Sequence, residues 1–171
     1  MYCIAGKNQC SIDALKYLLS RPDVKNDNIC VCPNNDDNGE DTWQPSLLKF
    51  ADKKNIKSRE LKELYCINDL KFFSLEYDRI VDTNNFISSK LFNFHFSLLP
   101  KYRGCHTNYL QIKNGEKYTG VTCHEIDNGI DSGKIVDQVR YNIEINDTAR
   151  ENYIKLMSTS VRLFIKLFDI L

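Results

Sequence analysis

Compact apolar runs and a longer apolar stripe alternate along the first part of the chain. Residues 2–5 and 28–32 are apolar runs of strand length, and between them the leucines of 12–19 recur at the spacing of one helix face. Ser11 stands where an N-cap is favoured, and Pro22 ends the stripe because the residue before a proline avoids helical backbone. The order strand, helix, strand predicts two parallel strands joined by a right-handed crossover.

The same patterns continue to the end of the chain. Helical spacing covers 44–54, with Pro45 in a first turn where proline is tolerated. The other segments of strand length are 55–59, 72–74, 79–82, 91–96, 118–126 and 134–145. Two further helices are expected at 106–113 and 148–170, the last of them capped by Asp147.

This order of elements predicts an α/β fold, in which a Rossmann-like, mostly parallel sheet carries flanking helices. No repeat, linker or low-complexity tract interrupts the sequence. We therefore expect a single domain over 1–171 that ends in a long helix from about residue 147.

The balance of charges bears on which classes of macromolecule the protein can bind. The chain has 171 residues, and its 23 Lys and Arg equal its 23 Asp and Glu. A net charge near zero argues against broad binding to nucleic acid or to anionic membranes. Because no charged-then-apolar leader and no long apolar span are present, we expect a cytoplasmic protein that is neither secreted nor inserted into a membrane.

Seven cysteines are many for this length, and their spacing is irregular. No Cys-x-x-Cys pair occurs among them, so a structural zinc site is not expected. Most of the thiols lie in strand-like apolar runs. We interpret them as small buried hydrophobic side chains in a reducing compartment.

Two runs carry the candidate chemistry. Residues 93–104 read Asn-Phe-His-Phe-Ser-Leu-Leu-Pro-Lys-Tyr-Arg-Gly, and Asn93 and His95 share one face of the predicted strand. Pro100 ends this strand because it has no N–H for the ladder. The second run, 118–133, places Asp131 on a glycine-flanked loop after another strand. An amide, an imidazole and a carboxylate can together stabilise an oxyanion and move a proton.

These two runs resemble the folate-dependent formyltransferases, which include glycinamide ribonucleotide formyltransferase, methionyl-tRNA formyltransferase and the sugar-nucleotide N-formyltransferases. The shared pattern is Asn-x-His-x-Ser-Leu-Leu-Pro, then Thr-Gly-Val-Thr, then an Asp within Gly-x-Asp-x-Gly. Residues 93–100, 119–122 and Asp131 match it. The resemblance is strong over about 70–145, and 73–80 is most similar to the sugar-nucleotide enzymes, which formylate amino sugars for polysaccharide biosynthesis.

The resemblance implies an N-formyltransferase that moves a formyl group from 10-formyltetrahydrofolate to the amine of a nucleotide-linked amino sugar, without a metal. Asn93 would donate to the oxyanion, an effect worth about 3–4 kcal/mol in comparable sites. His95 would relay the proton from the amine to the leaving nitrogen, and Asp131 would orient the imidazole and stabilise its charged form. Taken singly, each is a common core or turn residue, so the assignment depends on their occurring together.

The binding residues are expected in the loops around these runs. The resemblance points to two loops for the folate, with Phe86, Ile87, Leu91, Asp127, Asn128, Gly129 and Ile130 as candidates. Ordinary core contacts are an equal alternative for the three apolar residues before the motif strand. For the acceptor we expect Lys7, Asn8, Lys101, Tyr102 and Arg103, the first two at a helix N-terminus that suits an anion. A solvated surface turn is the alternative for both groups.

Two more histidines are weaker candidates. His106 begins the predicted helix after the motif and could reach a substrate, whereas His124 lies in a strand where a hydrogen-bonded structural role is favoured. Three other functions stay open: a 10-formyltetrahydrofolate hydrolase, another amine-formylating transferase, and a non-catalytic remnant that binds folate or nucleotide. The sequence does not identify the sugar, the nucleotide or the position of the amine.

The terminal helix bears on assembly. Its expected apolar stripe consists of Ile154, Met157, Val161, Phe164, Ile165 and Phe168. So much apolar surface on one terminal helix is hard for a small domain to cover. We expect this end either to form a homodimer or to mark a missing partner region, with burial inside a monomer as the alternative.

Overall fold

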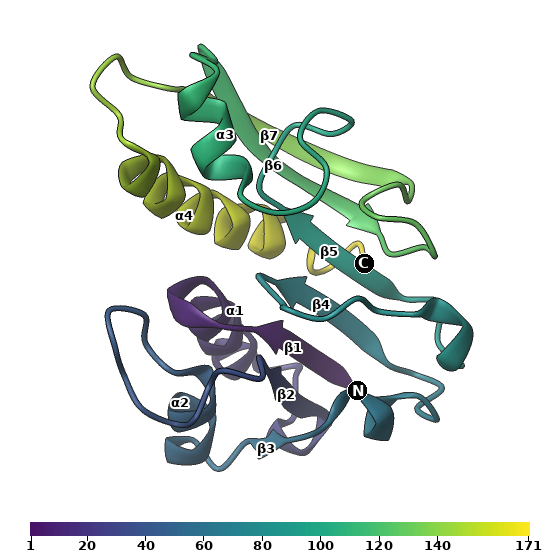
Figure 1. Cartoon of the computed structure of the whole chain (residues 1–171). Helices are drawn as coiled ribbons and strands as arrows, with labels where there is room; N and C mark the ends of the chain where they lie inside the picture. The colour runs from purple at the N-terminus through teal and green to yellow at the C-terminus, as the bar shows by residue number, and fades with distance from the viewer.

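The computed structural model describes the whole chain, residues 1–171, as a seven-stranded sheet with helices packed on it (Figure 1). The strands are β1 (Tyr2–Gly6), β2 (Ile29–Pro33), β3 (Lys57–Ser58), β4 (Lys71–Leu75), β5 (Leu91–His95), β6 (Tyr118–Glu125) and β7 (Ile135–Asn142). The helices are α1 (Asn8–Ser20), α2 (Leu47–Lys53), α3 (Thr107–Lys113) and α4 (Ala149–Leu167), and short 3₁₀ turns span Asn26–Asn28, Leu61–Leu64 and Thr83–Asn85. None of the helices is both long and apolar enough to span a bilayer.

The strand order β3-β2-β1-β4-β5-β6-β7 confirms the predicted Rossmann-like sheet. The first five strands in this order are parallel, whereas β6 runs antiparallel to both β5 and β7. From β1 the chain continues outward to β2 and β3, and then returns to the other side of β1 through β4. At this reversal neighbouring connections diverge, so a crevice opens beyond the carboxyl ends of β1 and β4, where open α/β sheets bind ligands.

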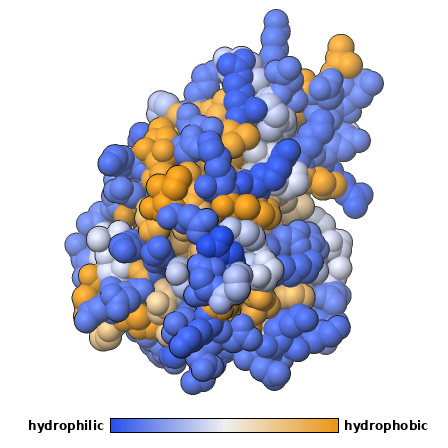
Figure 2. Space-filling model, turned by 180° about the vertical axis from the view of Figure 1, so that it is seen from behind, coloured by the Kyte–Doolittle hydropathy of each residue, from blue (hydrophilic) through white to orange (hydrophobic).

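Two apolar layers cover the two faces of the sheet. Alternate residues of a strand point to opposite faces, so Ile4 and Phe73 pack under α1, α2 and α4, whereas Cys3 and Phe72 face the other side. That second side is covered by the connections that contain Leu64 and by other short segments rather than by a long helix. Seen from behind, apolar residues gather toward the middle of the surface and hydrophilic ones surround them (Figure 2).

The predicted starts of two helices, α1 and α2, need correction. Helix α1 begins at Asn8 with Lys7 as its N-cap, so Ser11 lies inside the helix, where its hydroxyl donates to the Leu75 carbonyl at 2.9 Å. Helix α2 begins after Ser46, whose side chain accepts from the Lys49 N–H. Pro45 therefore precedes the helix instead of occupying its first turn. In each case a polar side chain has a tertiary or capping partner that the local pattern does not reveal.

The cap of α4 and the strand at 79–82 are also corrected. Thr148 is the N-cap of α4 and forms a reciprocal capping box with Glu151. Asp147 instead forms an ion pair with Lys155, with an Nζ–Oδ2 distance of 2.6 Å. Residues 79–82 form no strand but an irregular segment beside the crevice.

The buried face of α4 differs from the predicted stripe. Phe164 and Phe168 are buried as expected, but Ile154 and Ile165 are 51% and 40% exposed. The face also buries polar Asn152, whose side chain donates to the Asn108 carbonyl and to Gln111. Because such polar residues are satisfied by tertiary partners, hydropathy alone places the stripe at the wrong angle. Near the end of the chain Leu167 and Phe168 are buried, whereas Ile170 is 74% exposed. The homodimer stays a prediction.

Candidate active site

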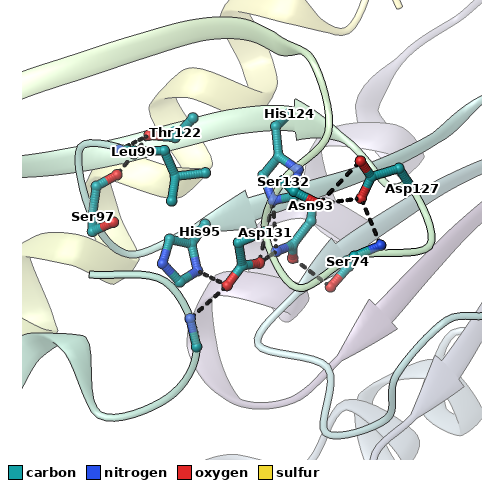
Figure 3. A network of polar contacts seen from close by, with 12 residues as sticks. Ser74, Asn93, His95, Ser97, Leu99, Thr122, His124, Asp127, Asp131 and Ser132 are labelled. Carbon is teal, nitrogen blue, oxygen red and sulfur yellow. Dashed lines mark hydrogen bonds and ion pairs between the residues drawn. The ribbon is translucent and has the colours of Figure 1, made fainter. Parts of the chain in front are cut away.

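Asn93, His95 and Asp131 meet in one cleft at the carboxyl edge of the sheet (Figure 3). The cleft has a volume of about 480 Å³ and is lined from β4, β5, β6 and the loops that follow them. Asn93 and His95 project together from β5, and Asp131 reaches them from the loop after β6. The structure thus brings the three predicted residues together, and their catalytic roles remain a proposal.

The carboxylate of Asp131 is the centre of the cluster. Its Oδ1 accepts from Asn93 Nδ2 at 3.2 Å and lies 3.4 Å from His124 Nε2. Its Oδ2 accepts from the Gly104 N–H at 2.8 Å and lies 3.4 Å from His95 Nδ1. Burial alone would raise the pKa of Asp131, but His124, His95 and the Gly104 N–H outweigh it and hold this pKa below its ordinary value. Asp131 is therefore anionic at neutral pH.

Asp131 lies on a loop that is held by internal hydrogen bonds. Asp127 accepts from the Ser132 hydroxyl at 2.9 Å and from the Gly129 N–H at 3.0 Å, which ties both ends of the loop together. Asp131 itself has φ of 47°, a left-handed conformation that aspartate adopts more readily than most residues. At Gly133 a Cβ would lie 1.9 Å from the Glu125 carbonyl oxygen, so only glycine fits there.

His95 has hydrogen-bond acceptors at both ring nitrogens. Its Nε2 lies 2.6 Å from the Tyr102 carbonyl oxygen, and since a carbonyl can only accept, Nε2 carries a hydrogen. Its Nδ1 faces Asp131, so the protonated ring is satisfied at both nitrogens. Burial nevertheless lowers the pKa of His95, against the opposing effects of Asp131 and the Tyr102 carbonyl. At neutral pH the imidazole is mainly uncharged and can accept a proton.

The amide of Asn93 is fixed from two sides. Its Oδ1 accepts from the Ser74 hydroxyl at 2.7 Å, which leaves the NH₂ group facing Asp131 and His124. Ser74 and Asn93 are paired in the parallel register of β4 and β5. The orientation of the Asn93 amide is thus set by a hydroxyl on the neighbouring strand.

His124 has a larger part in the cluster than its sequence context suggested. Its Nδ1 donates to the Glu125 carbonyl at 2.8 Å, and its Nε2 lies 3.2 Å from Asn93 Nδ2. The structural role expected for it is consistent with its 2% exposure, but its contacts are with the candidate catalytic residues. The antiparallel pairing of β5 and β6 places it opposite Asn93. The contact between His124 and Asn93 could be predicted from the sequence only if the register of β5 and β6 were known.

The remaining motif residues hold the segment that follows β5. The Thr122 hydroxyl donates to the Ser97 carbonyl at 2.6 Å and accepts from the Leu99 N–H at 3.0 Å (Figure 3). This contact joins the Ser-Leu-Leu-Pro segment to the Thr-Gly-Val-Thr strand. It positions the loop that supplies the Gly104 N–H and the Tyr102 carbonyl to the cluster.

The predicted folate residues divide into two groups. Gly129, Ile130 and Asp127 line the cleft, whereas Asn128 lies outside the lining and accepts from the Thr83 hydroxyl at 2.6 Å.

Phe86, Ile87 and Leu91, the apolar residues predicted before β5, lie outside the lining of the cleft, as in the alternative of ordinary core contacts for Leu91 and Phe86. Leu91 is a core residue at 1% exposure, and Phe86 packs on Tyr65 and Phe72. Ile87 lies at the opposite, amino-terminal edge of the strands, beside Met1. The apolar wall of the cleft consists instead of Tyr77, Ile80, Val81, Ile126 and Ile130. Sequence reasoning missed the residues of 77–81 because part of this irregular segment reads as a strand.

The predicted acceptor residues are also divided. Lys7 lines the cleft, and its Nζ lies 3.6 Å from Asp36. Asn8 is buried with a left-handed φ of 58°, and its side chain is bonded within the chain rather than free for a ligand.

The three residues after Pro100 lie outside the lining of the cleft. Lys101 and Tyr102 contact Glu116, and Arg103 is exposed. His106 lines the cleft, is exposed, and is the N-cap of α3. No group of three or more His, Cys, Asp or Glu side chains is arranged to hold a metal ion.

The sequence profile of the formyl transferase family matches residues 8–167. The chain belongs to the formyl transferase family. Two solved structures of sugar N-formyltransferases superpose on 98% of the chain, each with 48% identity and a TM-score of 0.95. One is WlaRD, a sugar 3N-formyl transferase, in the presence of dTDP and 5-N-formyl-THF. The other is the N-formyltransferase from Helicobacter canadensis in complex with folinic acid and dTDP-3-aminofucose.

Other members of the family match over shorter or more divergent stretches. The bifunctional polymyxin resistance protein ArnA of Wigglesworthia glossinidia brevipalpis is 42% identical over 113 residues, which is 63% of this chain and 17% of that protein. Several methionyl-tRNA formyltransferases match at 28% to 48% identity. The chain spans 61% and 62% of the two sugar N-formyltransferases, and so less than two thirds of these relatives.

Proposed function

We propose that this chain transfers the formyl group of 10-formyltetrahydrofolate to the amine of a nucleotide-linked amino sugar. The observation that carries the proposal is the Asn93, His95 and Asp131 cluster, in a cleft that is lined by both apolar and polar residues. The two sugar N-formyltransferases at 48% identity, whose structures hold formylated folates with dTDP or a dTDP-amino sugar, support both substrates.

The cluster can meet the two needs of this reaction. The amine nitrogen attacks the formyl carbon, a C–N bond forms, and the carbonyl electron pair moves to the oxygen. An N–H of Asn93, whose orientation Ser74 sets, would exchange its contact with His124 for one to that oxyanion. The tetrahedral intermediate then breaks its bond to the folate nitrogen, which leaves with a proton and yields tetrahydrofolate and a formamide.

His95 would carry the proton between the two nitrogens. Its lowered pKa keeps the ring mainly neutral and able to accept the proton of the amine. When Nε2 leaves the Tyr102 carbonyl, the neutral tautomer with its hydrogen on Nδ1, donated to Asp131, would present the Nε2 lone pair to the amine proton, and Asp131 would then stabilise the imidazolium from Nδ1. The apolar wall, which includes Val81 and Ile126, would hold the flat ring of the folate.

A sugar nucleotide is favoured over methionyl-tRNA by two observations. The 48% identity to sugar N-formyltransferases extends over 98% of the chain. The net charge is zero, whereas binding to tRNA normally requires a basic surface.

The seven cysteines are all unpaired, which is typical of a protein of the reducing cytoplasm.

The test is to incubate the chain with 10-formyltetrahydrofolate and a panel of nucleotide-linked amino sugars, and to detect formylation by mass. Release of tetrahydrofolate that depends on the amine supports the proposal. Release without any amine indicates a hydrolase, and folate binding without release indicates a non-catalytic protein. Formylation of methionyl-tRNA with no formylation of sugars would overturn the choice of substrate.

A further inference from the structure

Glu76 is a carboxylate that lines the same cleft but contacts none of the three predicted catalytic residues. It follows β4 directly, at the reversal of strand order between β1 and β4. Its φ of 61° is left-handed, a conformation that is costly for a residue other than glycine and persists only where the surroundings impose it.

The surroundings hold Glu76 from three elements. Its Oε2 accepts from the Tyr153 hydroxyl on α4 and from Asn8 Nδ2 at the start of α1. Asn8 Nδ2 also donates to the Tyr153 oxygen at 2.7 Å. The backbone carbonyl of Glu76 accepts from Asn34 Nδ2 at 2.9 Å. One carboxylate oxygen and the backbone are therefore fixed by the fold.

The second carboxylate oxygen of Glu76 has no partner. The hydrogen bonds of the Glu76 carboxylate are made by Oε2. Oε1 is not among the fully buried polar atoms without a partner, which belong to Arg59, Arg79 and Thr119, so it is accessible. Because Glu76 lines the cleft, Oε1 faces the space where a ligand would lie. No lysine, arginine or histidine forms an ion pair with Glu76, and Lys7 pairs with Asp36 instead. Burial raises the pKa of Glu76, against the opposing effects of the Tyr153 and Asn8 hydrogen bonds and the more distant charge of Lys7.

A carboxylate oxygen of this kind selects a hydrogen-bond donor and repels an anion. A phosphate is therefore a poor neighbour for Oε1, whereas a hydroxyl or an ammonium is a good one. We propose that Oε1 of Glu76 accepts a hydrogen bond from a donor on the sugar ring of the acceptor substrate, either a hydroxyl or the ammonium, and so helps to select that sugar. This inference rests on the proposed function. It places the sugar between Glu76 and the Asn93 cluster, and the diphosphate away from Glu76.

Binding measurements by calorimetry test the proposal without requiring turnover. The probes are a nucleotide-linked amino sugar, the free nucleoside diphosphate, and analogues of the sugar that lack one ring hydroxyl or the amine. Glu76→Gln keeps the shape of the side chain but removes its charge. It should raise the Kd of the amino sugar nucleotide about ten- to a hundredfold, because hydrogen bonds to charged groups are strong. The Kd of the free diphosphate should stay the same.

The analogues identify the donor. The analogue that lacks it should bind wild type and Glu76→Gln equally, because the contact is already absent. Glu76→Asp, which keeps the charge but withdraws it by one methylene, should also lose sugar affinity. Glu144→Gln is the matched control, since Glu144 is exposed and outside the cleft. Thermal melting of each variant checks that it is folded.

The outcomes separate this inference from the proposed function. Equal affinity of wild type and both Glu76 variants for the sugar nucleotide overturns the role of Glu76, as does an equal loss for the free diphosphate. Binding that depends on Glu76 without any formyl transfer overturns the proposed activity alone. Failure of the wild type to bind any of the nucleotide sugars overturns both.

Discussion

Replacing Asp131 with asparagine tests whether the cluster acts as one unit. The carboxylate faces four donors or ring nitrogens, with Gly104 N and His95 Nδ1 at Oδ2, and Asn93 Nδ2 and His124 Nε2 at Oδ1. An asparagine at 131 has one oxygen and one NH₂ group of nearly the same size. Whichever way its amide lies, the NH₂ group points at the N–H of Gly104 or at the NH₂ of Asn93.

The magnitude follows from these contacts. A donor left facing a donor costs about 1–3 kcal/mol. The imidazolium of His95 also loses its anionic partner, a contact of a kind worth about 1.5–3 kcal/mol. Together these losses amount to about 3–5 kcal/mol of transition-state stabilisation. We therefore expect Asp131→Asn to lower kcat by roughly two to four orders of magnitude.

The pH dependence gives a second, independent signature. Burial lowers the pKa of His95, and the charge of Asp131 opposes that effect. Without this charge the pKa of His95 should fall further. Because a neutral His95 must accept the proton, activity is lost as pH falls through its pKa. The acid limb of the kcat profile should therefore move to lower pH in Asp131→Asn.

The assay is tetrahydrofolate release at saturating folate and amino sugar nucleotide, across the pH range in which the wild type is folded. Asp23→Asn is the control, since Asp23 is exposed and pairs with Arg21 away from the cleft. A kcat within about threefold of wild type, which is a change of less than about 1 kcal/mol in the activation barrier, together with an unmoved acid limb, would refute the assignment of Asp131.

Three further results are expected. His95→Asn should lower kcat at least about a hundredfold through lost proton transfer, with an unchanged Kd for the folate by calorimetry; normal turnover would make His95 structural. Since burial raises the pKa of Glu76 above its ordinary 4.5, its stabilising effect is complete below that pH and is lost as pH rises through the raised value. Glu76→Gln should remove this pH dependence from the Tm measured by thermal melting. Curves of Tm against pH that run parallel in wild type and variant would contradict the burial argument. Thr148→Ala should cost about 0.5–2 kcal/mol of unfolding free energy in urea by breaking the capping box; no change would mean that the box contributes nothing.

The candidate residues of the site could be predicted because they lie in or directly after elements with clear local signals. Asn93 and His95 share a face in any strand that contains them, and Asp131 stands on a loop marked by glycines. The strand-helix-strand order likewise predicted the parallel sheet, which the structure confirms. These inferences use only periodicity, turn residues and the family motif.

The partners of those residues depended on tertiary structure. His124 reaches Asn93 only through the antiparallel register of β5 and β6, and Ser74 only through the parallel register of β4 and β5. Local sequence does not specify a register, because it is chosen by the packing of whole strands. The buried face of α4 was misjudged for the same reason, since tertiary hydrogen bonds satisfy Asn152 there.

The lining of the cleft, too, was decided by the tertiary structure rather than by the local sequence. The sequence by itself determined the fold class, the catalytic candidates and the family. Only the fold decided that Leu91 is core and that Ile80 lines the cleft. Only the fold decided, too, that Glu76 lines the cleft while Tyr153, 77 residues further along the chain, holds one of its oxygens. Contacts between residues so far apart exist only after the chain has closed, so no local pattern can encode them.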